Sequence, residues 1–260
     1  MADRPHDPLL VLLPSPLLGP AVWTPVAEHL GEAGWSVDVC RQPRGVTTAG
    51  DALAGFLEAV PADRPVVLVP HSNAGLFVPE VARQRPVVAT VFVDAALPPP
   101  VIARRSAQPG SPQPTGDPTS RTSSGETTLA PSAFLDFLEG LADAEGLLPP
   151  WTRWWADTDV DVLFPDQATR LRVEREEQRL PLAYFRDTVA VPAGWTDSPN
   201  AYLAFGDTYA DERRLAEQEG WPVVSLGGDH LHMLVAPAEV AAALTALLAR
   251  LGVPAPTGPR

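Results

Sequence analysis

Strand-like apolar runs alternate with helix-like segments along much of this chain, and that alternation constrains the fold more than any other feature. Continuous apolar runs such as residues 9–13 are typical of strands buried on both faces. Apolar residues at helical spacing, such as Leu53, Phe56, Leu57 and Val60, mark amphipathic helices between the runs. We predict strands at residues 9–13, 35–40, 66–69, 87–93, 201–205 and 222–226, and helices at 23–33, 53–60, 74–84, 212–220 and from 237 onward. This order predicts βαβ units and an α/β fold with a mostly parallel central sheet flanked by helices.

The alternation stops after residue 97 and resumes at Ala201. Residues 98–130 are rich in Pro, Ser, Thr and Gly, which predicts a flexible linker or mobile loop. Helices are predicted after it at 131–144 and 166–180, and three tryptophans lie between them, Trp151, Trp154 and Trp155. We therefore expect an α/β core from residues 1–97 and 199–260, and a flexible linker plus helical cap from residues 98–198.

Residues 66–84 predict a buried strand, a tight turn and a helix, with Ser72 at the tip of the turn. His71 precedes the serine, and the small residues Ala74 and Gly75 follow it. This layout is typical of a nucleophile elbow, in which backbone strain exposes a serine oxygen above a sheet. The alternative is an ordinary turn serine, and the strand–turn–helix context favours a nucleophile.

A nucleophilic serine needs an adjacent base, and histidine is the usual one. Three of the five histidines are poor candidates: His6 in the N-terminal tail, His29 inside a predicted helix, and His71, whose side chain points away from that of Ser72. His230 and His232 remain, in the loop after the last predicted strand, and we favour His230. A metal site formed by His230 and His232 is not favoured, because no third ligand lies at a suitable spacing in the sequence.

The order of serine, acid and late histidine followed by a C-terminal helix resembles the α/β-hydrolase superfamily. Leu234 and Pro237 follow His230 at the spacing that many members show, and Gly-Gly-Asp-His at 227–230 is similar to the plant hydroxynitrile lyase and esterase branch. Residues 13–23 (Leu-Pro-Ser-Pro-Leu-Leu-Gly-Pro-Ala-Val-Trp) line up with the His-Gly-x-x-x-x-Gly-x-x-x-Trp oxyanion loop of that branch. The resemblance covers about 1–97 and 199–252, and it implies the α/β-hydrolase fold and serine chemistry.

The chain departs from the family pattern around the expected oxyanion hole. Pro70 and Ala74 stand where the elbow usually has glycines, and Pro16 falls where the family offers a backbone N–H. Proline has no N–H, and losing one oxyanion donor costs about 2.7–4 kcal/mol of transition-state stabilisation. The N–H of Asn73 remains as a donor, with the N–H of Leu17 or the Ser15 hydroxyl as substitutes. With Pro16, the residues His71, Trp155 and Tyr209 complete the expected oxyanion and substrate-binding set.

The acid partner of His230 is open between two aspartates. Tyr209 stands where the family commonly has its acid, with Asp207 and Asp211 on either side. Asp94, after the strand that follows the elbow helix, occupies a position that some members use. We rank Asp94 and Asp207 equally and Asp211 behind them; for Asp94, a helix N-cap or a structural strand-end residue is the alternative.

Composition narrows the classes of partner. The net charge of −13 disfavours nucleic acid and anionic membranes. The lone Cys40 excludes a disulfide framework and a cysteine zinc site. No apolar run reaches the ~18 residues that span a bilayer, so a cytoplasmic location is the default. No cofactor is expected.

These patterns favour a serine-dependent enzyme acting on a small, fairly apolar ester, lactone or thioester. The tryptophans of the cap, Trp155 among them, form either a substrate wall or the cap's own core. Two alternatives remain: the same fold performing lyase, elimination or cyclisation chemistry in secondary metabolism, which the Pro16 departure motivates, and a non-catalytic small-molecule binder, which the displaced acid motivates. The oligomeric state is not predicted.

Overall fold

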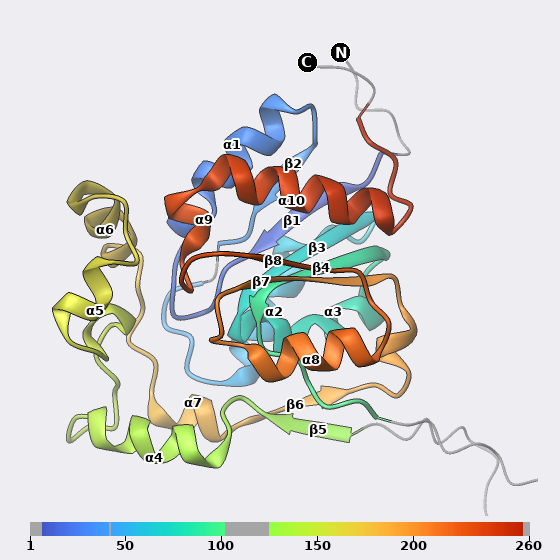
Figure 1. Ribbon diagram of the computed structural model, residues 1–260. Coiled ribbons are helices and arrows are strands. Elements are labelled where there is room, and N and C mark those ends of the chain that lie inside the picture. The colour runs from blue at the N-terminus through green and yellow to red at the C-terminus, as the bar shows by residue number, and fades with distance from the viewer. Residues whose placement is uncertain (1–6, 42, 102–124, 257–260) are drawn as a thin grey trace, which may run out of the picture.

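A parallel sheet forms the centre of the computed structural model, which describes residues 7–41, 43–101 and 125–256 (Figure 1). In these residues the central sheet has six strands in the order β2-β1-β3-β4-β7-β8, and every neighbouring pair is parallel. The strands are β1 (Leu9–Leu13), β2 (Val37–Val39), β3 (Val66–Ser72), β4 (Val87–Ala95), β7 (Asn200–Phe205) and β8 (Val223–Leu226). The predicted α/β fold with a mostly parallel sheet is confirmed. Ligands bind at the carboxyl ends of such strands, so β3, β4, β7 and β8 direct their following loops to one region.

Helices cover both faces of the sheet (Figure 1). On one face lie α1 (Thr24–Glu32), α9 (His232–Val235) and α10 (Pro237–Arg250), and on the other lie α2 (Ala49–Ala59), α3 (Val78–Gln84) and α8 (Ala210–Gln218). The α10 helix buries Val240, Leu244 and Leu247 at the spacing of one helix face, as the sequence predicts. A capping box between Thr48 and Asp51 starts α2 four residues before the first apolar position of the predicted stripe.

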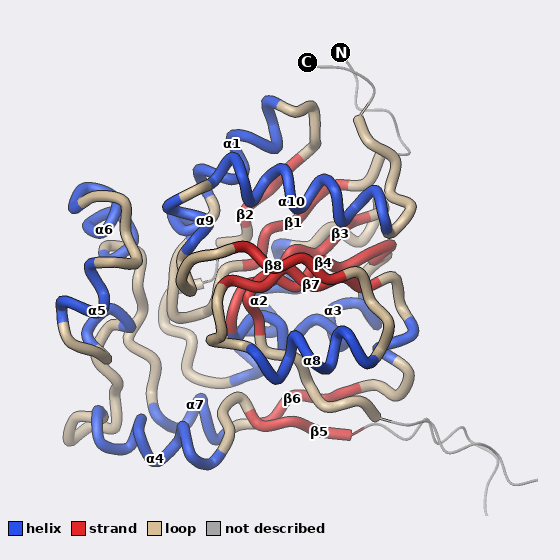
Figure 2. Tube along the Cα trace, viewed as in Figure 1, coloured by secondary structure: helices blue, strands red, loops and turns tan. Residues whose placement is uncertain are grey.

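Strands β4 and β7 are neighbours in the sheet. The long stretch of chain between them therefore leaves the sheet after β4 and returns to it beside β4. Its described part from residue 125 to residue 191, called here the inserted segment, carries a two-stranded antiparallel sheet of β5 (Gly125–Thr128) and β6 (Thr188–Val191) (Figure 2). Between these strands lie α4 (Ser132–Leu141), η3 (Trp151–Arg153), α5 (Asp157–Asp161), α6 (Gln167–Glu174) and α7 (Leu182–Arg186). The predicted linker at 98–130 is wrong at its end, where β5 pairs with β6, and residues 102–124 of it lie outside the described residues.

The helix predicted at 166–180 is also shorter than expected, since α6 ends at Glu174. Tertiary hydrogen bonds explain the difference. The Ala21 N–H donates to Glu176 Oε2 at 2.7 Å, and the Thr152 N–H donates to Glu177 Oε1 at 2.9 Å. These contacts to distant backbone compete with the hydrogen bonds of a continued helix.

No helix in the described part of the chain is long and apolar enough to cross a membrane.

Candidate active site

Ser72 lies at the tip of a strained turn between β3 and η2 (Asn73–Phe77). Its backbone φ is 57° and ψ is −133°, a conformation that non-glycine residues rarely adopt. The helix after the turn passes so close to β4 that a Cβ on Gly75 would lie 2.1 Å from the carbonyl oxygen of Ala96. Glycine is therefore required at position 75, whereas position 74 accommodates a buried alanine.

Asp94 is aimed by an irregularity at the end of β4. The register between β3 and β4 shifts there: His71 pairs with Val93, and Ser72 pairs with Ala95, so Asp94 is skipped. Its φ of 40° is the second positive value among the described non-glycine residues, Ser72 having the first. Bulges of this kind re-aim side chains next to functional sites. The buried carboxylate accepts the Phe205 N–H on Oδ1 at 3.1 Å, which fixes its orientation.

His230 follows β8 and meets the other oxygen of that carboxylate. Its Nδ1–H donates to Asp94 Oδ2 at 2.6 Å, a short bond to a carboxylate that orients the ring. The buried His71 ring stacks on the His230 ring, with 4.5 Å between the ring centroids. His71 also donates its Nε2–H to the His230 carbonyl at 3.0 Å. Burial, and secondly His230, hold the pKa of His71 well below its usual value, so His71 is a neutral support. It does not line the cavity described below.

The other candidate acids and bases have partners other than His230 and Ser72. The Asp207 side chain is 89% exposed and pairs with Arg213 at 3.4 Å. Asp211 pairs with Arg214 at 2.5 Å. His232 Nε2 lies 3.3 Å from Glu239. The sequence ranked Asp94 and Asp207 equally because both follow strand ends; the structure joins only Asp94 to His230.

A cavity of about 820 Å³ opens over Ser72 and His230, between the core and the inserted segment. Most of its wall is apolar or aromatic: Leu17, Leu76, Leu97, Leu129, Phe134, Trp151, Trp154, Trp155, Val160, Leu163 and Phe185. Trp151 lies 5.9 Å from the His230 ring, centroid to centroid. The buried Trp151 and Trp154 and the 40% exposed Trp155 therefore belong both to the packing of the inserted segment and to the cavity wall.

The oxyanion candidates fall on two loops at this cavity. Asn73 begins η2, where the first N–H groups of a helix have no partner within the helix. Its side chain is held by the inserted segment: Nδ2–H donates to Leu129 O at 3.0 Å, and Tyr184 O–H donates to Oδ1 at 2.7 Å. In the loop after β1, Pro16 offers no N–H, and the N–H of Leu17 makes a long 3.4 Å bond to Ser15 Oγ.

Tyr209 contacts Ser72 directly. Its hydroxyl lies 3.2 Å from Ser72 Oγ, and its ring lies 5.6 Å from the His230 ring. No hydrogen bond joins Ser72 to His230 among the described residues; such bonds are often long before substrate binds. The sequence placed Tyr209 at the family's acid position and among the expected oxyanion or substrate-binding residues, without a contact to Ser72. The contact spans 137 positions, and no local sequence signal predicts it.

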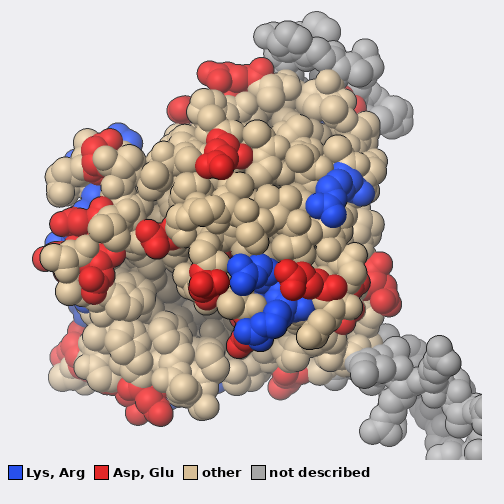
Figure 3. All heavy atoms as spheres, in the orientation of Figure 1, with Lys and Arg blue, Asp and Glu red and all other residues tan. Residues whose placement is uncertain are grey.

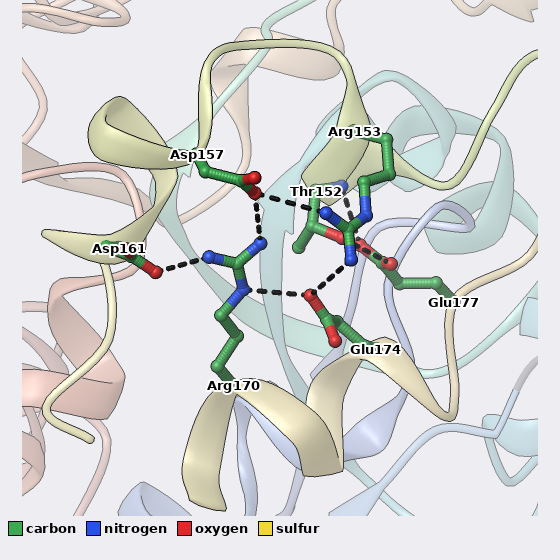
Figure 4. A network of polar contacts seen from close by, with 7 residues as sticks. All are labelled: Thr152, Arg153, Asp157, Asp161, Arg170, Glu174 and Glu177. Carbon is green, nitrogen blue, oxygen red and sulfur yellow. Dashed lines mark hydrogen bonds and ion pairs between the residues drawn. The ribbon is translucent and has the colours of Figure 1, made fainter. Parts of the chain in front are cut away.

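A polar network holds the wall of the cavity (Figure 4). Thr152, next to Trp151, donates its N–H and hydroxyl to Glu177 at 2.9 and 2.8 Å. The buried Arg170 joins α6 to α5 through Asp157 and Asp161, and it also binds Glu174 at 2.8 Å. In the described residues no group of three or more His, Cys, Asp or Glu side chains is arranged to hold a metal ion.

Comparison with solved structures identifies the fold as that of α/β-hydrolases. An extracellular α/β-hydrolase from a Paenibacillus species matches with a TM-score of 0.64 at 15% identity, over 93% of this chain and 99% of that chain. A pyrethroid hydrolase matches with a TM-score of 0.61 at 16% identity, over 94% and 98%. Tomato methylketone synthase I, complexed with 2-tridecanone, matches at 0.57 and 14%, over 94% and 99%. No protein-family model and no curated protein matches the sequence.

Proposed function

We propose that the protein is a serine-dependent enzyme that cleaves a small, fairly apolar ester, lactone or thioester. One arrangement supports this above all: His230 donates Nδ1–H to the buried Asp94 at 2.6 Å and shares a cavity wall with the strained Ser72. Serine, histidine and carboxylate in these roles form the triad of acyl transfer.

In the proposed reaction, Ser72 Oγ attacks the substrate carbonyl while its proton passes to His230 Nε2. Asp94 holds the imidazole tautomer and stabilises the imidazolium that forms. The Asn73 N–H donates to the oxyanion. Collapse of the tetrahedral intermediate expels the alcohol or thiol, which takes the proton from His230. Water then attacks the acyl carbon while its proton passes to His230. Collapse of the second tetrahedral intermediate breaks the bond to Ser72 Oγ, which takes the proton back from His230.

The substrate class follows from the cavity. Its aromatic and aliphatic wall favours an apolar acyl or alcohol part, and its volume of about 820 Å³ lies in the range of small-molecule sites. Solved structures of similar fold include enzymes named as an esterase and as a hydrolase, which supports the same chemistry.

Ester turnover in matched variants tests the proposal. Wild-type protein should turn over p-nitrophenyl acetate and butyrate, and Ser72→Ala and His230→Ala should each lower kcat by at least about 10³-fold. His232→Ala is the control for His230→Ala, because His232 faces Glu239, and it should keep most of the activity. Unchanged turnover in folded Ser72→Ala would overturn the proposal.

A second candidate is lyase or elimination chemistry on the same groups. Pro16 favours it, because proton transfer between a substrate, Ser72 and His230 needs no complete oxyanion hole. The similar fold of a methylketone synthase shows that this architecture is used by enzymes not named as hydrolases. A fluorophosphonate-reactive Ser72 together with no ester turnover would favour this candidate. A non-catalytic binder is less favoured than the sequence suggested, because Asp94 supplies His230 with a carboxylate.

A further inference from the structure

We propose that the Tyr209 hydroxyl is the second donor of the oxyanion hole, in place of the backbone N–H that is lost at Pro16. The inference rests on the proposed function, because it concerns the oxyanion formed when Ser72 attacks a carbonyl. It assigns a catalytic role to a residue at the position where the superfamily commonly has its acid.

The loop after β1 offers little to the oxyanion. Pro16 has no N–H. The following N–H, that of Leu17, points to Ser15 Oγ at 3.4 Å, and that of Leu18 donates to the Ser15 carbonyl at 2.9 Å. The turn therefore uses its own donors. The Asn73 N–H is left as a single backbone donor, and the loss of one oxyanion donor typically lowers kcat by about 10²–10³-fold.

Tyr209 has the reach to supply the second. Its hydroxyl lies 3.2 Å from Ser72 Oγ in the free protein. The oxyanion is bonded to the same carbon that Ser72 Oγ attacks, so it forms only two bonds away from that oxygen. A donor that already contacts Oγ needs a small shift to reach the new charge. The substrate carbonyl would thus replace Ser72 as the acceptor of the Tyr209 O–H and leave the serine free to face His230.

The surroundings of Tyr209 suit a donor and not a base. Burial, with Asp94 and Glu212 as further causes, raises the pKa of Tyr209 above its ordinary value. The phenol therefore keeps its proton at neutral pH. No cation contributes to the shift, so no positive charge stabilises a phenolate. Its ring packs beside the His230 ring, which fixes the direction of the hydroxyl.

The proton and electron balance is simple. The Ser72 Oγ–carbon bond forms, the serine proton passes to His230 Nε2, and the carbonyl π pair moves to oxygen. The oxyanion accepts hydrogen bonds from Asn73 N–H and Tyr209 O–H, and neither donor gives up its proton. On collapse the leaving group takes its proton from His230.

Tyr209→Phe tests the role, since it removes the hydroxyl and keeps the ring. We expect kcat/KM to fall by about 10²-fold or more, mostly in kcat. The fold decrease in kcat/KM should be the same for p-nitrophenyl butyrate and ethyl butyrate. A loss confined to the poor leaving group of the ethyl ester would show that Tyr209 protonates the leaving group, and a loss below about threefold with both esters would also overturn the inference.

A trifluoromethyl ketone separates catalysis from packing, because its adduct on Ser72 carries the oxyanion while a bound ester does not. The inhibition constant should rise in Tyr209→Phe by about the same factor as kcat/KM falls, with KM changed little. Equal changes in KM and the inhibition constant would indicate a structural role and contradict the inference. If Tyr209→Phe melts well below the wild type, the double variant Pro16→Ala/Tyr209→Phe is measured as well. The backbone N–H restored at position 16 should raise kcat/KM at least tenfold above that of Tyr209→Phe. No recovery would refute the proposal that Tyr209 replaces this donor.

Wild type and Ser72→Ala are measured in parallel to separate the two claims. If wild-type turnover does not depend on Ser72, the proposed function fails and the Tyr209 inference fails with it. If turnover depends on Ser72 but is unaffected by Tyr209→Phe, the inference alone fails.

Discussion

Asp94 Oδ2 accepts the Nδ1–H of His230 at 2.6 Å, although Asp94 lies on the strand next to Ser72 and not on the strand before Tyr209. The β3–β4 register shift and the positive φ of Asp94 turn its carboxylate toward the loop after β8. The hydroxyl of Tyr202 holds the bulge in place: it accepts the Ala95 N–H at 3.0 Å and donates to the Ala95 carbonyl at 2.7 Å. Moving the acid to β4 leaves the end of β7 free for Tyr209.

Asp94→Asn should lower kcat/KM for p-nitrophenyl butyrate by about 10³–10⁴-fold, because an amide favours the wrong tautomer of His230 and does not stabilise imidazolium. Asp207→Asn is the matched control: its carboxylate is exposed and pairs with Arg213, so activity should stay within about twofold of wild type on the general expectation for surface substitutions. A larger loss in Asp207→Asn than in Asp94→Asn would assign the acid to Asp207.

Gly75→Ala should destabilise the fold, because the new Cβ would lie 2.1 Å from the backbone oxygen of Ala96. Overpacking of this kind costs about 1–3 kcal/mol, and it would also displace the turn that carries Ser72. Gly140→Ala in α4 is the control, since nothing lies within 4 Å of its added Cβ; replacing a helical glycine should stabilise by about 0.5–1 kcal/mol. Urea unfolding of both variants measures the difference, and equal effects would contradict the close approach at Gly75.

Glu177→Gln should change how stability depends on pH. Burial raises the pKa of Glu177 from 4.5 to about 7. Between those values the folded protein holds a proton that the unfolded chain has released, so this group's contribution to the unfolding free energy decreases as pH rises. Relative to Glu177→Gln, the wild type should lose up to about 3 kcal/mol from pH 4.5 to 7.5.

The Gln variant keeps an acceptor for Thr152 and cannot titrate, so the difference between the two proteins isolates Glu177 from every other group that changes charge in this range. Denaturant melts at half-unit pH steps would measure it. A difference that is constant across the window, or that grows in favour of the wild type as pH rises, would contradict the raised pKa.

The charge on the cavity wall predicts discrimination against anionic substrates. Four acidic residues line the cavity, Asp159, Asp211, Glu212 and Asp229, and no arginine is among the described lining residues. Figure 3 shows that acidic side chains are also spread over the visible face. We expect kcat/KM for p-nitrophenyl hemisuccinate to be at least about tenfold below that for the neutral butyrate ester, a difference of roughly 1.4 kcal/mol. Added salt should reduce the difference in kcat/KM between the two esters, because it screens the repulsion. Equal kcat/KM values at low salt would refute an electrostatic origin.

The sequence predicted the sheet and the serine turn because both leave local signals: apolar runs, helical spacing, and small residues after Ser72. It did not predict β5, since Gly-Glu-Thr-Thr at 125–128 has no apolar run and becomes a strand only by pairing with β6. The end of α6 was missed for the same reason, because contacts from Glu176 and Glu177 to distant backbone compete with local helix propensity.

At the site, the sequence placed Ser72 and His230 in loops at suitable strand ends but could not decide between Asp94 and Asp207. Both follow strands, and only the register shift at Asp94, a property of two paired strands, turns one of them to His230. The Ser72–Tyr209 contact has the same character: it depends on how the loop after β7 folds back over the elbow, which no spacing within either segment encodes.

Covalent labelling of Ser72 tests the central claim most directly. Wild-type protein is treated with a fluorophosphonate probe, digested, and searched by mass spectrometry for the modified residue. We predict one probe adduct, on Ser72, formed much more slowly in His230→Ala and Asp94→Asn and absent in Ser72→Ala. Folded wild-type protein that remains unlabelled, or that is labelled at another residue with Ser72 intact, would contradict it.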